Sequence, residues 1–332
     1  MKRQIAIFAL PGVLLSGAVS AHADANSLLS TWNAITVSNA NFNNEYEGAA
    51  FVGGNLTALQ TLGSGVQGKV SGSTPTLVVG GNVTTSGTIN ANAGSVFVTG
   101  KNSANYNFNG GGSLHTGSSE AATVSPVTAL IQDSLYWSTL TPTGTISTNN
   151  AQQLNFNATS SSSLAVIDAT AAQTFNAGLN GFNLNYSSAV NTVLINISGG
   201  NINWSNGSFF GNFQTDFGRG NVLFNFYNAT NVVLSGQFEG YIMAPNANVT
   251  LGNNVDGGVM ASNLVADSEV HLPDRNVSTS SWYGALPDNA PAPVPPVGTA
   301  SPRPRSQTAI WSRSRPTRAA TSRAAIRSLT SR

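Results

Sequence analysis

The chain has 332 residues and no cysteine, and only 8% of its residues are charged. A typical globular domain has about 25% charged residues, so this composition argues against a compact body covered by charged helices. Without cysteine, disulfides, thiolate metal sites and a cysteine nucleophile are excluded. The charge is uneven: residues 289–332 contain eight arginines and no acid, whereas residues 24–288 contain four basic and thirteen acidic residues, a net charge of −9.

Residues 1–23 have the pattern of a secretory signal peptide. Lys2 and Arg3 precede an apolar run, and Ala21-His22-Ala23 fits the small-x-small cleavage rule. The pattern predicts export, either as a secreted protein or to the cell surface. No later stretch is apolar and long enough to span a bilayer, so we expect no transmembrane span in the mature chain.

In residues 221–264, short segments alternate between apolar and polar residues, and each segment ends at Gly, Asn or Asp. This pattern indicates short strands. Glu239-Gly240 precedes one such strand and Asp256-Gly257 precedes another, 17 residues later, while Glu47-Gly48 precedes a third. A recurring acid-Gly turn before a small, apolar strand predicts stacked coils. We therefore predict an all-β, β-solenoid or β-helix-like domain over residues 24–286, in which these acids cap structural turns.

Two near copies, Gly-Gly-Asn-Leu-Thr at 53–57 and Gly-Gly-Asn-Val-Thr at 80–84, mark further corners. Glycine pairs permit positive φ at such corners, and asparagine tolerates the left-handed region. Asparagines stacked between coils are also expected to form hydrogen-bonded ladders.

One accessory α-helix is predicted over about residues 125–140, lying alongside the coils. Ser125 is the expected N-cap and Pro126 the first helical residue. Four apolar residues share one face at helical spacing, and we expect that face to be buried: Val127, Leu130, Ile131 and Leu135.

Residues 201–220 form an aromatic-rich insertion among Gly and Asn. Exposed rings can stack on sugars or anchor a protein partner, so four residues are candidate ligand contacts: Trp204, Phe209, Phe210 and Phe213. The alternative is that these rings fill the interior of the coils or cover an open end.

Catalytic and metal-binding patterns are weak, so we predict no enzyme and no cofactor. His271 has Asp267, Glu269 and Asp274 nearby, which could form a metal or acid–base site but equally a solvated loop cluster. Stacked carboxylates at the acid-Gly turns could serve a polysaccharide-active enzyme on a β-helix scaffold. Asp and Asn in the turns leave structural calcium open, although no EF-hand loop or calcium-binding nonapeptide repeat is present.

Two threonine clusters bear on ice binding: Thr84, Thr85 and Thr88, and Thr143, Thr145 and Thr148. Ice binding needs a flat face of regularly spaced threonines, and these clusters are local. Residues 287–332 begin with a Pro-rich linker and continue as an Arg-rich tail that we expect to be disordered. This tail has no folded nucleic-acid reader motif, so no nucleic-acid partner is expected. It is either a genuine basic arm or a frameshifted remnant of an anchor.

Four segments resemble the choice-of-anchor A family of bacterial surface proteins: EGAAFVGGNLT (47–57), the predicted helix with the Thr-Gly-Thr at 143–145, VLINISGG (193–200) and the long run over 222–261. The resemblance covers about residues 30–285 and implies a non-enzymatic adhesive or structural role at the cell surface or in the matrix. The implied partner is an extracellular glycan or a matrix or cell-surface component. An extracellular polysaccharide-active enzyme and an ice-binding-like protein are the alternatives.

Overall fold

The computed structural model describes residues 25–120, 126–150, 152–176, 178–205, 207–272 and 279–289. All of these lie within one compact unit, Met1–Asn289, and a second unit spans Ala290–Arg332. The predicted signal peptide, Ser125, Asp274 and the Arg-rich tail from residue 290 lie outside the described residues.

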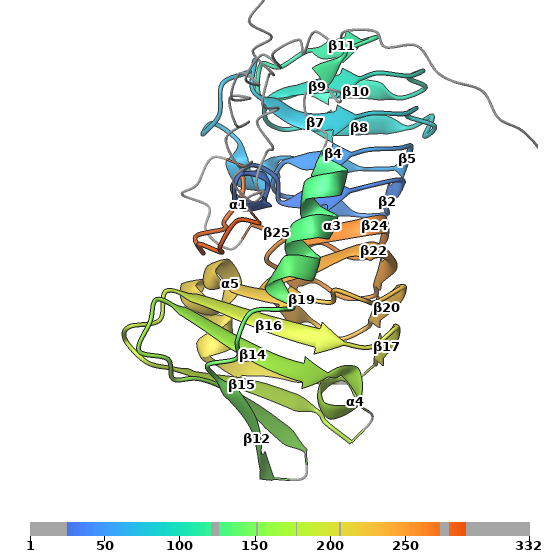
Figure 1. Cartoon of the computed structure of the whole chain (residues 1–332). Helices are drawn as coiled ribbons and strands as arrows, with labels where there is room; N and C mark the ends of the chain where they lie inside the picture. Colours follow the sequence, from blue (N-terminus) through green and yellow to red (C-terminus); the bar gives the residue numbers. More distant parts are fainter. Residues whose placement is uncertain are drawn as a thin grey trace, which may run out of the picture. The chain divides into compact units, whose positions relative to one another are not determined.

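The described residues are predominantly β-structure, and most strands belong to one 14-stranded sheet (Figure 1). Its main path runs through β11 (Leu114–Thr116), β9 (Ser95–Val98), β7 (Pro75–Val79), β4 (Ala50–Val52), β1 (Ala34–Thr36), β24 (Val259–Ala266), β22 (Tyr241–Leu251), β19 (Val222–Asn225), β16 (Thr192–Ser198) and β14 (Leu164–Thr170). Four strands branch from this path: β17 (Asn201–Trp204), β20 (Asn231–Leu234), β2 (Ala40–Phe42) and β5 (Leu56–Ala58).

Two smaller sheets and a few helices complete the described elements. The seven-stranded sheet has the order β10 (Asn105–Phe108), β8 (Thr88–Ala91), β6 (Thr61–Leu62), β3 (Glu45–Tyr46), β25 (Val270–His271), β23 (Val255–Asp256) and β21 (Phe238–Glu239). The four-stranded sheet contains β12 (Thr145–Asn150), β13 (Gln153–Ala158), β15 (Gly181–Tyr186) and β18 (Ser208–Gly211). The helices are α1 (Ala25–Thr31), α3 (Pro126–Trp137), α4 (Ala171–Thr174) and α5 (Asp216–Asn221), with 3₁₀ turns at η1 (Ser64–Val66) and η2 (Asn212–Gln214).

Strand pairing is parallel throughout the two larger sheets, and among the described strands only β12 and β13 pair antiparallel. Parallel sheets built from short strands without intervening helices are consistent with the predicted β-helix-like fold. The predicted single accessory helix is an underestimate, because α1, α4 and α5 are also present. Their sequences are too short to show a helical period.

The coils do not stack in sequence order. From β1 the chain passes through β4, β7 and β9 to β11, and α3 then leads to the other end of the sheet, where the chain resumes at β12 and winds back to β24 (Figure 1). β1 therefore lies between β4 and β24, with Ile35 opposite both Phe51 and Met260. The first and last coils of the domain are therefore neighbours.

The three acid-Gly turns lie in one stack, as predicted. Glu239 pairs with Asp256 between β21 and β23, and Asp256 pairs with His271 between β23 and β25. Because Val270 is opposite Tyr46, Glu47 occupies the next position in the column. The repeated acid-Gly turns therefore occupy equivalent positions in the stack, although they are up to 209 residues apart in the chain.

Glycine is required at these corners for two physical reasons. Gly240 has φ +104°, a conformation that L side chains rarely adopt. At Gly257 a Cβ would lie 2.0 Å from the carbonyl oxygen of Gly240 in the coil next to it. The predicted positive φ at Gly54 and Gly81 is not found; there a Cβ would meet a neighbouring backbone oxygen at 2.8 and 2.6 Å, so close stacking is the reason for glycine.

Helix α3 lies across the outer side of the 14-stranded sheet (Figure 1). Strands beneath it are buried on both sides, so their sequences are almost continuously apolar. In β16, for example, residues Val193–Ile197 are all apolar except Asn196. Alternate residues form two clusters: one faces the interior, and the other faces the helix and includes Leu194, Leu223, Met243, Met260, Ile35 and Phe51. The predicted position of the helix alongside the coils is therefore confirmed.

The predicted buried face of this helix is only partly correct. Leu130 is buried, but Leu135 is 46% exposed, and the side chain of Val127 is not described. The buried face instead contains Asp133, Ser134 and Trp137. Ser134 donates a hydrogen bond of 2.6 Å to Asn225 of the sheet, so polar partners rotate the helix away from its most apolar stripe.

Three of the four candidate aromatic contacts are buried, which makes the surface-recognition interpretation wrong for them. Trp204, Phe209 and Phe213 are 1%, 2% and 0% exposed, and Phe209 packs edge-on against the other two rings. Phe210 is 41% exposed because it follows Phe209 on the same strand and points outward. The rings fill the interior of the C-terminal coils, as the alternative interpretation held.

The adjacent pair Phe209 and Phe210 gives a matched test of this packing. Phe209→Ala should lower the free energy of unfolding by about 3–5 kcal/mol because it removes a buried ring and leaves a cavity. Phe210→Ala should lower it by about 1 kcal/mol or less because solvent already reaches this ring. Urea denaturation of both variants measures the difference, and equal losses would contradict the assignment.

Candidate functional site

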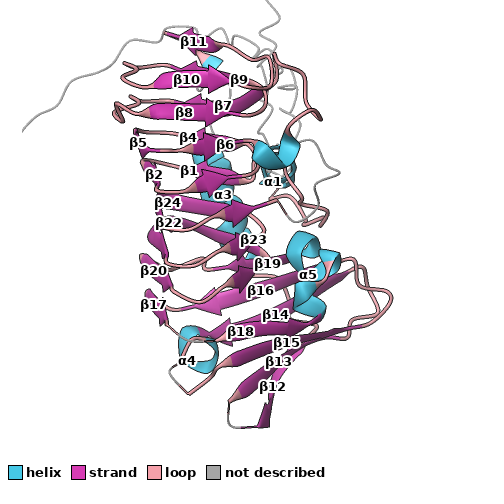
Figure 2. Ribbon diagram, turned by 180° about the vertical axis from the view of Figure 1, so that it is seen from behind, coloured by secondary structure: helices cyan, strands magenta, loops and turns pink. Residues whose placement is uncertain are grey.

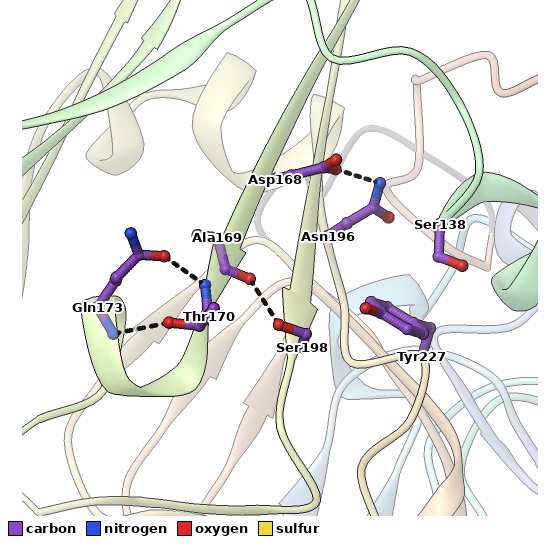
Figure 3. Close-up of a pocket in the computed structure, with 8 residues that line it drawn as sticks. All are labelled: Ser138, Asp168, Ala169, Thr170, Gln173, Asn196, Ser198 and Tyr227. Carbon is purple, nitrogen blue, oxygen red and sulfur yellow. Dashed lines mark hydrogen bonds between the residues drawn. The ribbon is translucent and has the colours of Figure 1, made fainter.

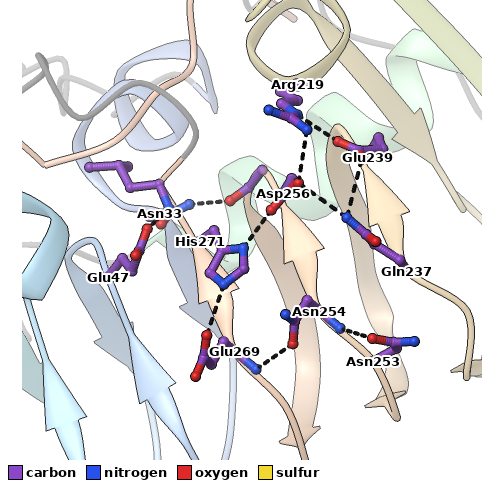
Figure 4. Close-up of polar contacts among 12 residues, drawn as sticks. Asn33, Glu47, Arg219, Gln237, Glu239, Asn253, Asn254, Asp256, Glu269 and His271 are labelled. Atoms are coloured by element: carbon purple, nitrogen blue, oxygen red, sulfur yellow. Dashed lines mark hydrogen bonds and ion pairs between the residues drawn. The ribbon is translucent and has the colours of Figure 1, made fainter. Parts of the chain in front are cut away.

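Six ionisable side chains and one glutamine gather at the stacked acid-Gly corner. We call this set the corner network: Arg219, Gln237, Glu239, Asp256, Glu269, His271 and Glu47 (Figure 4). Glu239, Asp256 and His271 lie at the same position of β21, β23 and β25 in successive coils, and Glu47 directly follows β3 at the next position. Arg219 comes from α5, which packs beside this column.

Charges alternate along the corner network. Arg219 Nε lies 2.7 Å from Glu239 Oε2, and its Nη2 lies 3.2 Å from Asp256 Oδ2. The other oxygen of Asp256 is 2.5 Å from His271 Nδ1, and His271 Nε2 is 2.9 Å from Glu269. Every ionic side chain in this run therefore has an opposite charge beside it.

These contacts shift the pKa values of three members. The hydrogen bond to Asp256, against the effect of burial, raises the pKa of His271 to about 9. Burial raises the pKa of Glu239 to about 7 despite the adjacent Arg219. Burial by itself would raise the pKa of Asp256, but the hydrogen bond from His271 and the charge of Arg219 lower it.

The role of the turn acids is more varied than predicted. Glu47 caps backbone as expected, because its Oε2 accepts a hydrogen bond of 2.8 Å from the N–H of Leu272. Glu239 and Asp256 instead form ion pairs with Arg219, a residue that the sequence interpretation missed. The available signal was that Arg219 is the only arginine between residues 4 and 274.

The predicted cluster around His271 is only partly assembled. Glu269 contacts the histidine, but Asp267 instead accepts a hydrogen bond of 2.6 Å from Asn43. At neutral pH both ring nitrogens of His271 donate to carboxylates, so the ring has no free lone pair for a base or a metal ion. Among the described residues, no group of three or more His, Asp and Glu side chains is placed to hold a metal ion.

The pKa shifts predict how stability depends on pH. A raised pKa in the folded state contributes stability below the unfolded pKa, and that contribution disappears as the pH passes the folded value. The free energy of unfolding should therefore fall as the pH rises from about 6.5 to about 9, by at most about 3 kcal/mol from His271. Urea denaturation across this range measures the slope.

Two variants test whether His271 causes this fall in the free energy of unfolding with pH. His271→Gln should remove most of the decline above pH 6.5, because glutamine does not titrate. His115→Gln is the matched control: His115 is exposed and stacks on Phe97 away from the corner network, so the decline should persist. A decline that survives His271→Gln would contradict the assignment.

A second feature is a polar face that follows β17, β20, the second halves of β22 and β24, β2 and β5 and has no acidic side chain in its outward columns; Lys101 is its next rung beyond Asn82. We call it the asparagine face; its strands run along one side of the stack in Figures 1 and 2. One outward column consists of Asn201, Asn231, Asn248, Asn263, Asn39, Asn55 and Asn82. The adjacent column contains Asn203, Val233, Thr250, Val265 and Asn41. Thr57 and Thr84 continue it beyond a register shift that puts Ala58 opposite Asn41.

Hydrogen bonds join the asparagines of this face into the predicted ladder. Asn263 Nδ2 donates to Asn248 at 2.9 Å, and Asn263 Oδ1 accepts from the backbone N–H of Asn39 at 3.1 Å. The same contact recurs from Asn55 to Asn39 at 2.9 Å and from Asn82 to Asn55 at 2.8 Å. The ladder is continuous across the junction of the two halves of the chain and fixes the outward side chains.

The threonine clusters are divided among different surfaces. Thr84 belongs to the asparagine face and is exposed, whereas Thr88 begins β8 in the seven-stranded sheet. Thr145 begins β12 in the four-stranded sheet. Their proximity in sequence therefore does not create a threonine array, as expected.

Within the described residues, no helix is sufficiently long and apolar to cross a membrane.

Comparison with known proteins adds one family and one structure. No curated protein matches the sequence. An ice-binding protein from the Antarctic ascomycete Antarctomyces psychrotrophicus is similar in structure with a TM-score of 0.30 and 12% identity, over 74% of this chain and 96% of that one. Residues 25–272 match the family described as "Putative Ice-binding-like adhesive domain", which covers the coils, α3 and the corner network. The chain belongs to this family of ice-binding-like adhesive domains.

Proposed function

We propose that the protein is an exported, non-enzymatic adhesive or structural protein of the bacterial cell surface or matrix, and that it attaches through the asparagine face. The observation that carries the proposal is the continuous ladder of Asn248, Asn263, Asn39, Asn55 and Asn82 on a face whose outward columns contain no carboxylate. Membership of an adhesive-domain family supports it.

The physical argument rests on repetition and rigidity. Each coil adds one outward amide and one small side chain at the strand spacing of about 4.8 Å. Amides that are already held by their neighbours lose little conformational entropy when they bind. Many weak contacts of this kind add up when several copies are displayed together.

The partner class follows from the chemistry of this face. Asn and Thr offer both donors and acceptors, and no Asp or Glu lies in either outward column. Such a surface suits a neutral extracellular glycan or an uncharged matrix or cell-surface component. The same proposal includes three further points. The chain is a choice-of-anchor A protein, the leader at residues 1–23 directs its export, and it uses no cofactor.

Two alternatives have their own tests. A polysaccharide-active enzyme would release soluble sugar and lose that activity in Glu239→Gln, but the carboxylates of the corner network are paired with Arg219, His271 and backbone. Ice binding is favoured by the regular ladder of the asparagine face and the family description. It would appear as thermal hysteresis and faceted ice crystals in solutions of the protein.

Negative charge placed on the asparagine face should weaken attachment strongly. In Thr57→Glu/Thr84→Glu, two exposed neighbouring side chains of the face become carboxylates that must be desolvated on contact. We expect cell or matrix attachment of beads coated with the protein to fall at least about tenfold. Thermal unfolding followed by circular dichroism should change little.

The control places the same charges elsewhere. Thr88 and Asn105 are likewise exposed and are paired neighbours, but they lie in the seven-stranded sheet. Thr88→Glu/Asn105→Glu should attach like the unmodified protein. Equal loss in both variants would show that net charge, and not this face, controls attachment.

A further inference from the structure

A polar cavity lies where the C-terminal end of α3 meets strands β14 and β16. Its volume is about 290 Å³, and its lining includes Ser138, Asp168, Thr170, Asn196, Ser198 and Tyr227 (Figure 3). Four segments supply these side chains: the residue after α3, strands β14 and β16, and the loop after β19. Gln173 of α4 also lines the cavity. The corner network is not involved.

The central residues of this cavity are held in place by a relay of buried amides. Asn196 is 2% exposed, and its Nδ2 donates to Asp168 Oδ1 and to the carbonyl of Trp137, both at 3.0 Å. Its own oxygen accepts from Asn225 at 2.9 Å, and Asn225 is bonded in turn to Ser134 of α3. Asp168 is therefore oriented by a chain of fixed partners.

The relay uses only one of the two oxygens of Asp168. The side chain of Asp168 is exposed, and among the described residues nothing donates to its Oδ2. The Tyr227 hydroxyl likewise has no hydrogen-bond partner among these residues, and the ring lies across the cavity from Asp168 (Figure 3). If Asp168 served only to anchor α3, its Oδ2 and the Tyr227 hydroxyl would not need to face the same cavity.

These groups match the surface of one sugar ring. A carboxylate accepts hydrogen bonds from two adjacent hydroxyls, and hydroxyl side chains such as Ser138 and Ser198 can donate or accept. An aromatic ring packs against the C–H face of a pyranose. The volume is at the lower end of the range for small-molecule sites, about 300–1,000 Å³, which favours one sugar unit in the cavity.

The cavity continues into a wider depression that leads to the asparagine face. Thr170 and Ser198 line both, and the depression also contains Asn201, Asn203 and Asn228. Asn201 and Asn203 begin the two outward columns of the asparagine face at β17. A chain of sugars could therefore have one unit in the cavity and the next units along the coils.

We propose that the cavity at Asp168 and Tyr227 binds one neutral hexopyranose unit of an extracellular glycan. This inference rests on the proposed adhesive function and specifies its ligand. A single carboxylate without a basic partner disfavours acidic sugars, and the surrounding hydroxyl and amide groups supply the partners that a polyol requires.

The test uses the full chain and methyl glycosides of glucose, galactose, mannose and N-acetylglucosamine, with glucuronic acid and glucosamine as charged probes. Saturation-transfer NMR identifies binders, and calorimetric titration measures affinity. At least one neutral glycoside should bind, and Asp168→Asn should weaken it at least about tenfold through the lost charge-assisted hydrogen bonds. Tyr227→Ala should weaken it to a similar extent, and Tyr227→Phe less.

Asp267→Asn is the matched control, because Asp267 is also an exposed carboxylate with one asparagine partner. It should bind the glycoside like the unmodified protein. The proposal would be overturned if no neutral glycoside bound, or if Asp168→Asn bound it with unchanged affinity. It would also be overturned if glucosamine were the only probe that bound. Attachment of the unmodified protein is measured in parallel: attachment without glycoside binding refutes the sugar site only, whereas no attachment refutes the adhesive function.

Discussion

Pairing of β1 with β24 is the constraint on which the whole stack depends. The N-terminal coils grow away from β1 in one direction, and the C-terminal coils arrive at β24 from the other. Parallel pairing in register, with Ala34 opposite Val259 and Thr36 opposite Ala261, makes one sheet of two halves. A shift of one residue would turn every inward side chain of one half outward, so the register is strongly fixed by the buried interior.

The surface features inherit their continuity from this junction. The asparagine ladder crosses it between Asn263 and Asn39, and the corner network crosses it between His271 and the coil of Glu47. Each feature therefore contains residues from both ends of the domain. The corner network and the asparagine face lie on different sheets of the same coils, which separates a stabilising arrangement of ion pairs from a surface free for contact.

Helix α3 has two structural consequences. It connects the ends of the stack, so that the chain can return to its starting coil, and it covers the apolar outer side of the 14-stranded sheet. Its C-terminal end also supplies the Trp137 carbonyl to which Asn196 is bonded, and so helps to shape the polar cavity. A connecting element thereby contributes to a candidate binding site.

The sequence alone determined the short strands, the shared position of the acid-Gly corners, the asparagine ladder and the helix beginning at Pro126. These follow from period-two alternation and from repeated corners, which are local signals. It did not determine the order of the coils, because nothing near Ala34 indicates that its neighbour is Val259. Nor did it separate buried Phe209 from exposed Phe210, place Arg219 at the corner, or bring Asp168, Asn196 and Tyr227 around one cavity. Those outcomes depend on which coils stack together, and stacking joins residues that are far apart in the chain.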